Sequence, residues 1–169
     1  MEKQVHTIPP IFDGRSRILI LGSFPSVKSR QVQFYYGNPQ NRFWNVLAGV
    51  LGETVPEAAE ERRRFLLSHG IALWDVIQSC VITGSADSSI RDAVPNDLSG
   101  LLERCTIRRI YTNGSAAAGL YRKLLLPQTG REAVTLPSTS PANASYSLER
   151  LISCWQVIAE ELENPHRSL

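Results

Sequence analysis

The sequence has few of the residues that hold metal ions. It contains only three cysteines and three histidines in 169 residues. The cysteines, Cys80, Cys105 and Cys154, show no C-x-x-C spacing, and no two histidines stand three or four positions apart. This argues against a structural zinc site or an iron–sulfur cluster held within one loop. We therefore expect no metal and no cofactor, and three buried core thiols.

Long hydrophobic runs are also missing. No apolar stretch approaches the roughly 18 residues that a membrane helix needs, and the first residues lack the basic-then-apolar layout of a signal peptide. Glycine and proline, at 11 and 10 residues, stay at ordinary levels, which excludes collagen-like and low-complexity chains. We expect a single domain over residues 1–169, acting as a monomer in the cytoplasm.

No large excess of charge of one sign is present either. The chain carries 18 basic and 16 acidic residues, a net charge of +2, so its overall field does not require a nucleic-acid partner. Fifteen of the basic residues are arginines, whose planar fork suits phosphate groups. A GC-rich gene would produce the same bias, so composition leaves the partner open.

Two common catalytic patterns are absent. Neither G-x-G-x-x-G nor G-x-x-x-x-G-K-[ST] occurs, which excludes the usual phosphate cradles of dinucleotide-binding and P-loop proteins. A serine hydrolase would need G-x-S-x-G followed by a histidine, and the only late histidine, His166, lies three residues from the end.

Alternating strands and helices are what the sequence does contain. Residues 17–21 form an apolar run that ends at Gly22, typical of a strand buried on both faces of a parallel sheet. We expect further strands at 71–74, 107–112 and 133–136, and helices at 41–51, 56–69, from about 95–97, 115–126 and 148–162. This order predicts an α/β fold, a three-layer α/β/α sandwich around a four-stranded, mainly parallel sheet.

Polar loops follow three of these strands, at residues 22–26, 113–115 and 137–143. Ligands of open parallel sheets bind beyond the carboxyl ends of the strands. Glycine there lets the backbone approach a ligand, and free amides with serine hydroxyls could hold a phosphate. The alternative is that glycine, serine and proline only make turns.

The segment 34–44 is rich in aromatic and amide side chains. Aromatic faces stack on nucleobases, and asparagine amides read a base edge or orient a water molecule. Phe43 falls on the apolar face of the expected helix, and Tyr35 or Trp44 could simply fill the loop. Tyr36 and Asn41 are left as candidates for chemistry.

Three motifs together resemble those of the uracil-DNA glycosylase superfamily. They are Gly-Ser-Phe-Pro at 22–25, Asn-Pro-Gln-Asn-Arg-Phe-Trp at 38–44, and Leu-Pro-Ser-Thr-Ser-Pro at 136–141. The resemblance extends from the first strand to the final helix. It implies an α/β enzyme that removes a damaged base from DNA by hydrolysis of the N-glycosidic bond.

One departure indicates the subfamily. Most of the superfamily has a catalytic Asn or Asp where this chain has Phe24, which cannot hold a water molecule. Together with Tyr35-Tyr36, the Trp-Asp-Val at 74–76 and the Gly-Ser-x-Asp at 84–87, this resembles the hypoxanthine-DNA glycosylase family (family 6). The resemblance makes Asn41 the catalytic residue, which would position the attacking water and could interact with the departing base. Hypoxanthine is the expected base, with xanthine or uracil as alternatives.

The resemblance also implies a set of binding residues. The expected base-binding residues are Gly22, Ser23, Phe24, Pro25, Tyr36 and Asn113. The expected DNA-contacting residues are Ser26, Lys28, Ser138, Ser140, Pro141, Ala142 and Asn143. Tyr36 would stack on the base, and Ala142 or Asn143 would enter the space that the flipped nucleotide leaves.

Water is the expected nucleophile, because Lys28 is the only lysine near these motifs. Two other functions stay open. One is hydrolysis of free nucleosides or nucleotides in the same pocket. The other is binding of nucleic acid without catalysis, if the missing first-motif amide marks an inactive relative.

Overall fold

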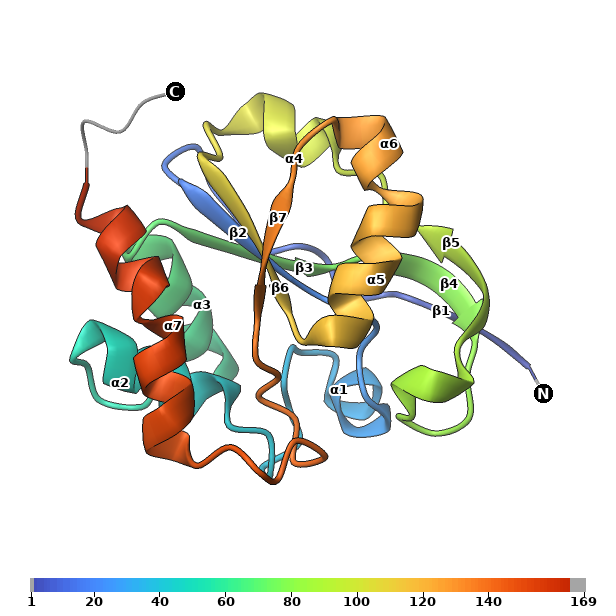
Figure 1. The fold of residues 1–169 in the computed structure, drawn as a ribbon, viewed down its shortest axis with the longest axis horizontal. Helices are drawn as coiled ribbons and strands as arrows, with labels where there is room; N and C mark the ends of the chain where they lie inside the picture. The colour runs from blue at the N-terminus through green and yellow to red at the C-terminus, as the bar shows by residue number, and fades with distance from the viewer. Residues whose placement is uncertain (1, 165–169) are drawn as a thin grey trace.

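A four-stranded parallel sheet forms the centre of the molecule. The computed structural model describes residues 2–164, so that His166 lies outside the described residues. The strands lie in the order β3 (Ile71–Asp75), β2 (Ile18–Gly22), β6 (Arg109–Asn113) and β7 (Ala133–Leu136), all parallel. Figure 1 shows these strands at the centre of the molecule, between the helices. The predicted sheet is confirmed.

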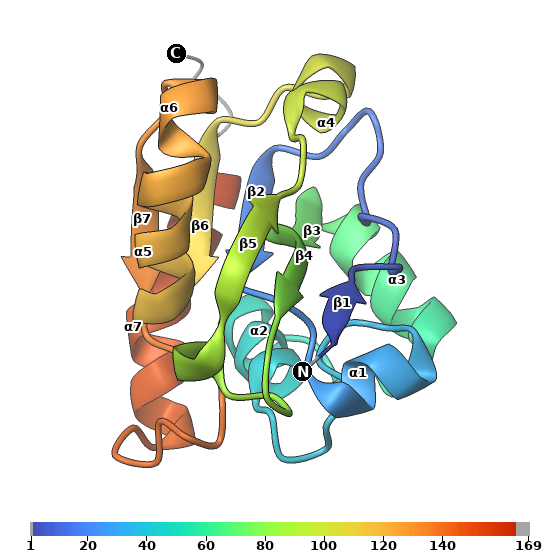
Figure 2. The ribbon, with the colours of Figure 1, turned by 90° about the vertical axis from the view of Figure 1, so that its right-hand side faces the viewer.

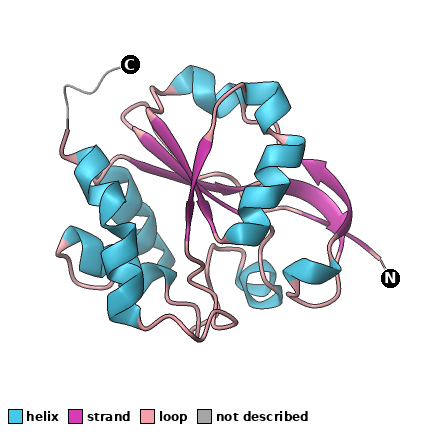
Figure 3. Ribbon diagram, in the orientation of Figure 1, coloured by secondary structure: helices cyan, strands magenta, loops and turns pink. Residues whose placement is uncertain are grey.

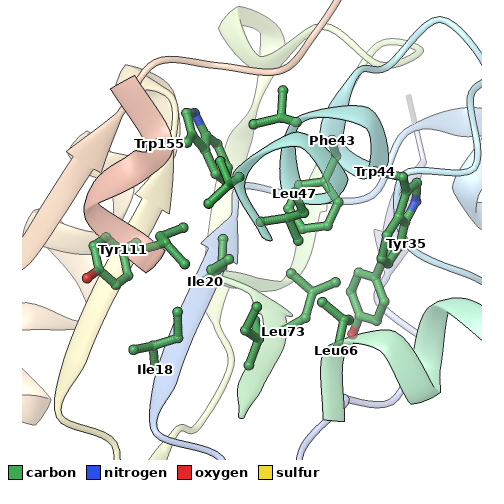
Figure 4. Packing of buried hydrophobic residues seen from close by; sticks show 14 of the residues in the cluster. Ile18, Ile20, Tyr35, Phe43, Trp44, Leu47, Leu66, Leu73, Tyr111 and Trp155 are labelled. Atoms are coloured by element: carbon green, nitrogen blue, oxygen red, sulfur yellow. The ribbon is translucent and has the colours of Figure 1, made fainter. Parts of the chain in front are cut away.

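Alternate side chains of β2 point into two separate hydrophobic cores. Ile18 and Ile20 pack under α2 (Phe43–Leu51), α3 (Ala59–Ser68) and α7 (Leu148–Leu162), together with the fully buried Trp155 (Figure 4). Leu19 and Leu21 face the opposite core, with residues of α4, α5 and α6. These last helices span Ser99–Arg104, Ser115–Leu124 and Leu126–Thr129. Helices thus cover both faces of the sheet (Figure 3), which confirms the three-layer sandwich.

A second, antiparallel sheet was not predicted. It consists of β1 (Lys3–Val5), β4 (Ile77–Val81) and β5 (Arg91–Pro95), in the order β1-β4-β5 (Figure 2). The helix expected from residues 95–97 begins at Ser99 instead. The buried Asn96 is not a helix opener, because its amide donates to the carbonyl oxygens of Asp75 (2.9 Å) and Ile77 (3.2 Å). Strands β1 and β5 are largely exposed and lack a hydrophobic alternation, so pairing with the more buried β4 makes them strands.

Two short helical segments flank the edge where the parallel strands end. They are α1 (Val27–Val32) and the 3₁₀ helix η1 (Asp87–Ser89).

No helix among residues 2–164 is long and apolar enough to cross a membrane. Cys80 and Cys105 are buried as expected, but Cys154 is exposed, because it lies on the outer face of α7 one residue before Trp155.

Candidate active site

A small pocket opens at the carboxyl edge of the parallel sheet, where the loops after β2, β3, β6 and β7 meet. Its volume is about 160 Å³, below the roughly 300–1,000 Å³ of pockets for drug-sized ligands, so it suits one base better than a whole nucleotide. The expected site residues that line it are Gly22, Ser23, Phe24, Pro25, Ser26, Tyr36, Asn41, Asn113, Ser138, Ser140 and Pro141. Lys28, Ala142 and Asn143 lie outside this lining.

Several lining residues were not named as site residues from the sequence. They are Ser29, Tyr35, Asn38, Asp75, Ser85, Asp87 and Thr139. Asp75 and Asp87 belong to the Trp-Asp-Val and Gly-Ser-x-Asp motifs. These motifs could therefore have identified both aspartates as site residues from the sequence. Thr139 lies inside the Ser-Thr-Ser-Pro run, where only the neighbouring serines were considered.

Asn41 presents an amide N–H group to the pocket. Its Oδ1 accepts hydrogen bonds from the backbone N–H of Phe43 (3.0 Å) and from the hydroxyl of Thr139 (2.8 Å). Because a backbone N–H can only donate, this atom must be the oxygen. Both lone pairs of Oδ1 are then occupied, and Nδ2 has no partner among the described residues. Asn41 is thus poised to donate a hydrogen bond to whatever enters the pocket.

Thr139 sets this orientation from the end of another strand. Its side chain is fully buried, and its Oγ1 accepts from Nδ2 of Asn113 (3.0 Å) while donating to Asn41. The backbone N–H of Thr139 donates to Oδ1 of Asn113 (3.1 Å). The chain of contacts from Asn113 through Thr139 to Asn41 therefore connects β6, the loop after β7 and the start of α2.

Replacing Thr139 with valine is expected to slow base excision by about 10-fold to 100-fold, because Asn41 loses the donor that orients it. Serine at this position keeps the hydroxyl and should stay within about threefold of the wild type. Single-turnover rates of both variants, with melting temperatures, provide the measurement. Equal rates for the valine and serine variants would contradict the orienting role of the hydroxyl.

Tyr36 contributes its hydroxyl to the pocket as well as its ring. The hydroxyl accepts from Nδ2 of Asn113 (3.1 Å), and one face of the ring stacks on Phe43 at 4.0 Å between centroids. Burial, together with the charge of Asp75, raises the pKa of Tyr36 above its ordinary value. The phenol is therefore protonated and can donate a hydrogen bond. Stacking on a base stays a prediction for the ring face opposite Phe43. It is an alternative to a hydrogen bond from the hydroxyl, because one base cannot meet both the face and the hydroxyl edge of the ring.

Gly22 makes space on the pocket floor. A Cβ atom at this position would lie 2.5 Å from Oδ1 of Asp75 and 2.9 Å from the hydroxyl of Tyr36. Gly22 and Asp75 are opposite each other in the register of β2 and β3, which brings the carboxylate to this point. A hydrogen-bond acceptor, the Asp75 carboxylate, and a hydrogen-bond donor, the Tyr36 hydroxyl, therefore lie side by side next to Gly22.

The loop of η1 forms one wall of the pocket. Ser23 donates from Oγ to Oδ1 of Asp87 at 2.7 Å. Loss of water contact raises the pKa of the Asp87 carboxyl, with the hydrogen bond from Ser23 opposing and the charge of Asp75 adding to the shift. Arg30 donates to the carbonyl of Gly84 (2.8 Å) and lies over the Phe24 ring. Phe24 is largely buried and packs in the core on that side of the sheet.

The pocket is acidic. Its lining within the described residues contains two carboxylates, Asp75 and Asp87, and no Lys, Arg or His. Burying a phosphate against two carboxylates would be strongly unfavourable. The interior therefore suits a neutral group with N–H donors.

Arg42 holds the loop that follows β7. Its guanidinium donates to the carbonyl oxygens of Asn143 (3.0 Å) and Tyr146, and its backbone N–H donates to that of Thr139 (3.1 Å). Asn143 folds its amide back onto the carbonyl of Ser138 (3.0 Å). Ala142 stays exposed between these points, so the loop is rigidly held but ends in a small side chain.

The fold is that of a superfamily of base-excising enzymes. The family model described as "Uracil DNA glycosylase superfamily" matches residues 9–160, and the chain belongs to this superfamily. Two relatives are more particular, since both are named hypoxanthine DNA glycosylase. The protein from Methanosarcina acetivorans is 40% identical over 151 residues, covering 89% of this chain and 94% of the relative. The protein from Methanosarcina barkeri is 33% identical over 156 residues, covering 92% and 96%.

A solved structure is similar as well. A solution NMR structure from Methanosarcina acetivorans, named as a candidate uracil DNA glycosylase, matches with a TM-score of 0.78 and 41% identity. It covers 92% of this chain and 96% of that chain. The family resemblance drawn from the three motifs and from Phe24 is confirmed.

Proposed function

We propose that this protein is a DNA glycosylase that removes deaminated bases, hypoxanthine first, by hydrolysing the N-glycosidic bond. The observation that carries the proposal is the pocket floor over Gly22, where the Asp75 carboxylate and the Tyr36 hydroxyl stand together. The similarity to two proteins named hypoxanthine DNA glycosylase supports the same substrate.

The floor complements the edge that deamination creates. When adenine becomes hypoxanthine, the N1 acceptor becomes an N–H donor, and the neighbouring amino group becomes a carbonyl. Asp75 can accept from this N–H while Tyr36 donates to the carbonyl. Adenine would instead oppose its N1 lone pair to a carboxylate oxygen, which leaves buried polar groups unpaired and disfavours binding. Uracil and xanthine carry the same lactam edge and stay as alternative substrates.

Asn41 acts on the departing base in this proposal. Base excision requires the nucleotide to leave the stack, and cleavage passes through an oxocarbenium-like sugar while negative charge grows on the base. The free N–H of Asn41 can stabilise that charge, as donors of an oxyanion hole do. The described lining contains no lysine, which supports water as the nucleophile over a Schiff base.

A panel of substrates tests the function. Single-turnover excision is measured for deoxyinosine in a stable duplex pair, in a mismatch, in a single strand and as the free nucleoside, with Asn41→Ala as the blank. Because Ala142 is a small wedge, we expect excision from single strands and mismatches to be at least as fast as from the stable pair. Fast hydrolysis of the free nucleoside would favour the nucleoside hydrolase, and inactivity on every DNA substrate would favour a noncatalytic relative.

Further features expected from the sequence belong to this proposal. They are the flipping of the base, a single monomeric domain, catalysis without a metal and a place in the cytoplasm.

A further inference from the structure

His6 lies directly behind the pocket floor, although it does not line the pocket. Its Nε2 is 2.8 Å from Oδ2 of Asp75, and the two side chains are only 1% and 5% exposed. The imidazole lies among three aromatic rings, those of Phe24, Tyr35 and Trp74, with centroids 6.0–6.4 Å away. The contact spans 69 residues of sequence and joins the N-terminal segment to the end of β3.

The backbone around this pair is held on both sides. The N–H of His6 donates to the carbonyl of Gln78 (2.7 Å), which extends the pairing of β1 with β4. The carbonyl of Asp75 accepts from the buried amide of Asn96 (2.9 Å). The relative positions of imidazole and carboxylate are therefore set by two sheets rather than by a mobile loop.

The two oxygens of Asp75 differ in their surroundings. Oδ2 is bonded to His6, whereas Oδ1 receives no hydrogen bond from the described residues and stands over Gly22 in the pocket. Oδ1 is not among the fully buried, unpartnered side-chain atoms of the described residues, so it is reached from the pocket. A base that covers it must donate an N–H there, because a desolvated carboxylate oxygen without a donor is costly. The hydrogen bond from His6 fixes the rotation of the carboxylate. Without it the carboxylate group could rotate, and the direction in which its oxygens face the pocket would no longer be fixed.

We propose that His6 is a positioning residue for base selection. It donates to Oδ2 of Asp75 and so directs Oδ1 at the lactam N–H of a deaminated base. The N-terminal segment that follows β1 then contributes to the discrimination between deaminated and normal bases. The inference rests on the proposed glycosylase function, because it needs a base in the pocket.

Two substitutions separate this role from packing. His6→Gln keeps an amide N–H close to the position of Nε2, whereas His6→Phe keeps the ring shape without a donor. Excision of hypoxanthine is compared with excision of unsubstituted purine, which lacks both the N1–H and the carbonyl, in the same single-stranded sequence. We expect His6→Phe to reduce the hypoxanthine-to-purine rate ratio by about 10-fold to 100-fold and His6→Gln to restore it to within about threefold.

A double-mutant cycle with Asp75→Asn provides a second readout. If His6 acts through Asp75, adding His6→Phe to Asp75→Asn should change the rate of hypoxanthine excision by less than about threefold. If the two residues act independently, the rate losses of the two single variants should multiply in the double variant. Melting temperatures are measured for every variant, and His6→Met replaces His6→Phe if the latter does not fold.

The outcomes are distinct. An unchanged rate ratio in the folded donor-free variant would overturn the inference, as would equal loss on both bases with no rescue by glutamine, which is the pattern of a purely structural link. Absence of hypoxanthine excision by the wild-type protein would instead overturn the proposed function, before any variant is compared.

Discussion

Replacing Asn41 with alanine is expected to lower the single-turnover rate of base excision by about 10²-fold to 10³-fold, the usual effect of removing one preorganised donor. The fold and the affinity for DNA should change little, because Asn41 is only partly buried and lies in the loop before α2. Circular dichroism and a binding titration check these two points. Asn45→Ala, at an exposed asparagine in the first turn of α2, is the matched control and should behave as the wild type.

Asn41→Asp tests which atom of the amide matters. Aspartate keeps an oxygen for the N–H of Phe43 and the hydroxyl of Thr139, but it replaces the free N–H with an acceptor. We expect a loss as large as that of alanine, because a second negative oxygen would oppose charge on the departing base. An active aspartate variant would show that position 41 activates water instead of stabilising the base.

Asp75→Asn is the second substitution with a large expected effect. The amide can bond to His6 through its oxygen, and it then turns N–H groups toward the base instead of an acceptor. The variant loses the charge-assisted hydrogen bond to the base, and its amide N–H faces the N1–H of hypoxanthine, so that two donors oppose each other. Together these effects should slow hypoxanthine excision by about 10²-fold. The adenine-to-hypoxanthine rate ratio should rise at the same time, because the N1 of adenine accepts from an amide.

The control for this prediction is Asp92→Asn on the exposed strand β5. Asp92 has a φ of 52°, a conformation that asparagine also adopts readily, so its fold should be kept. Rates on oligonucleotides that differ only in the target base measure both ratios. An Asp75→Asn variant that retains the wild-type preference would exclude the carboxylate as the group that reads the lactam edge.

Local patterns in the sequence were sufficient for the parallel sheet and for three loops of the site. The apolar run that ends at Gly22 reflects burial on two faces, which a continuous hydrophobic segment records directly. Turn residues mark the loops for the same reason, since their preference is local. Asn41 was also within reach, because an amide among aromatic residues next to a helix face is visible in the sequence.

The second sheet was decided by tertiary structure alone. Strand β5 carries the pattern of an exposed segment, and it is a strand because it pairs with β4. Cys154 was misjudged for a related reason, since the apolar character of a thiol says nothing about which face of α7 it occupies.

The working parts of the pocket depend on register and on contacts across long stretches of chain. Asp75 reaches the floor because it lies opposite Gly22 in the paired strands β2 and β3. His6 reaches Asp75 across 69 residues, and Thr139 reaches Asn41 across 98. No local preference encodes such a distance, because it follows from how the strands are ordered and packed. The sequence by itself therefore determined the family, the sheet and the amide of Asn41, whereas tertiary structure decided which groups orient that amide and which carboxylate meets the base.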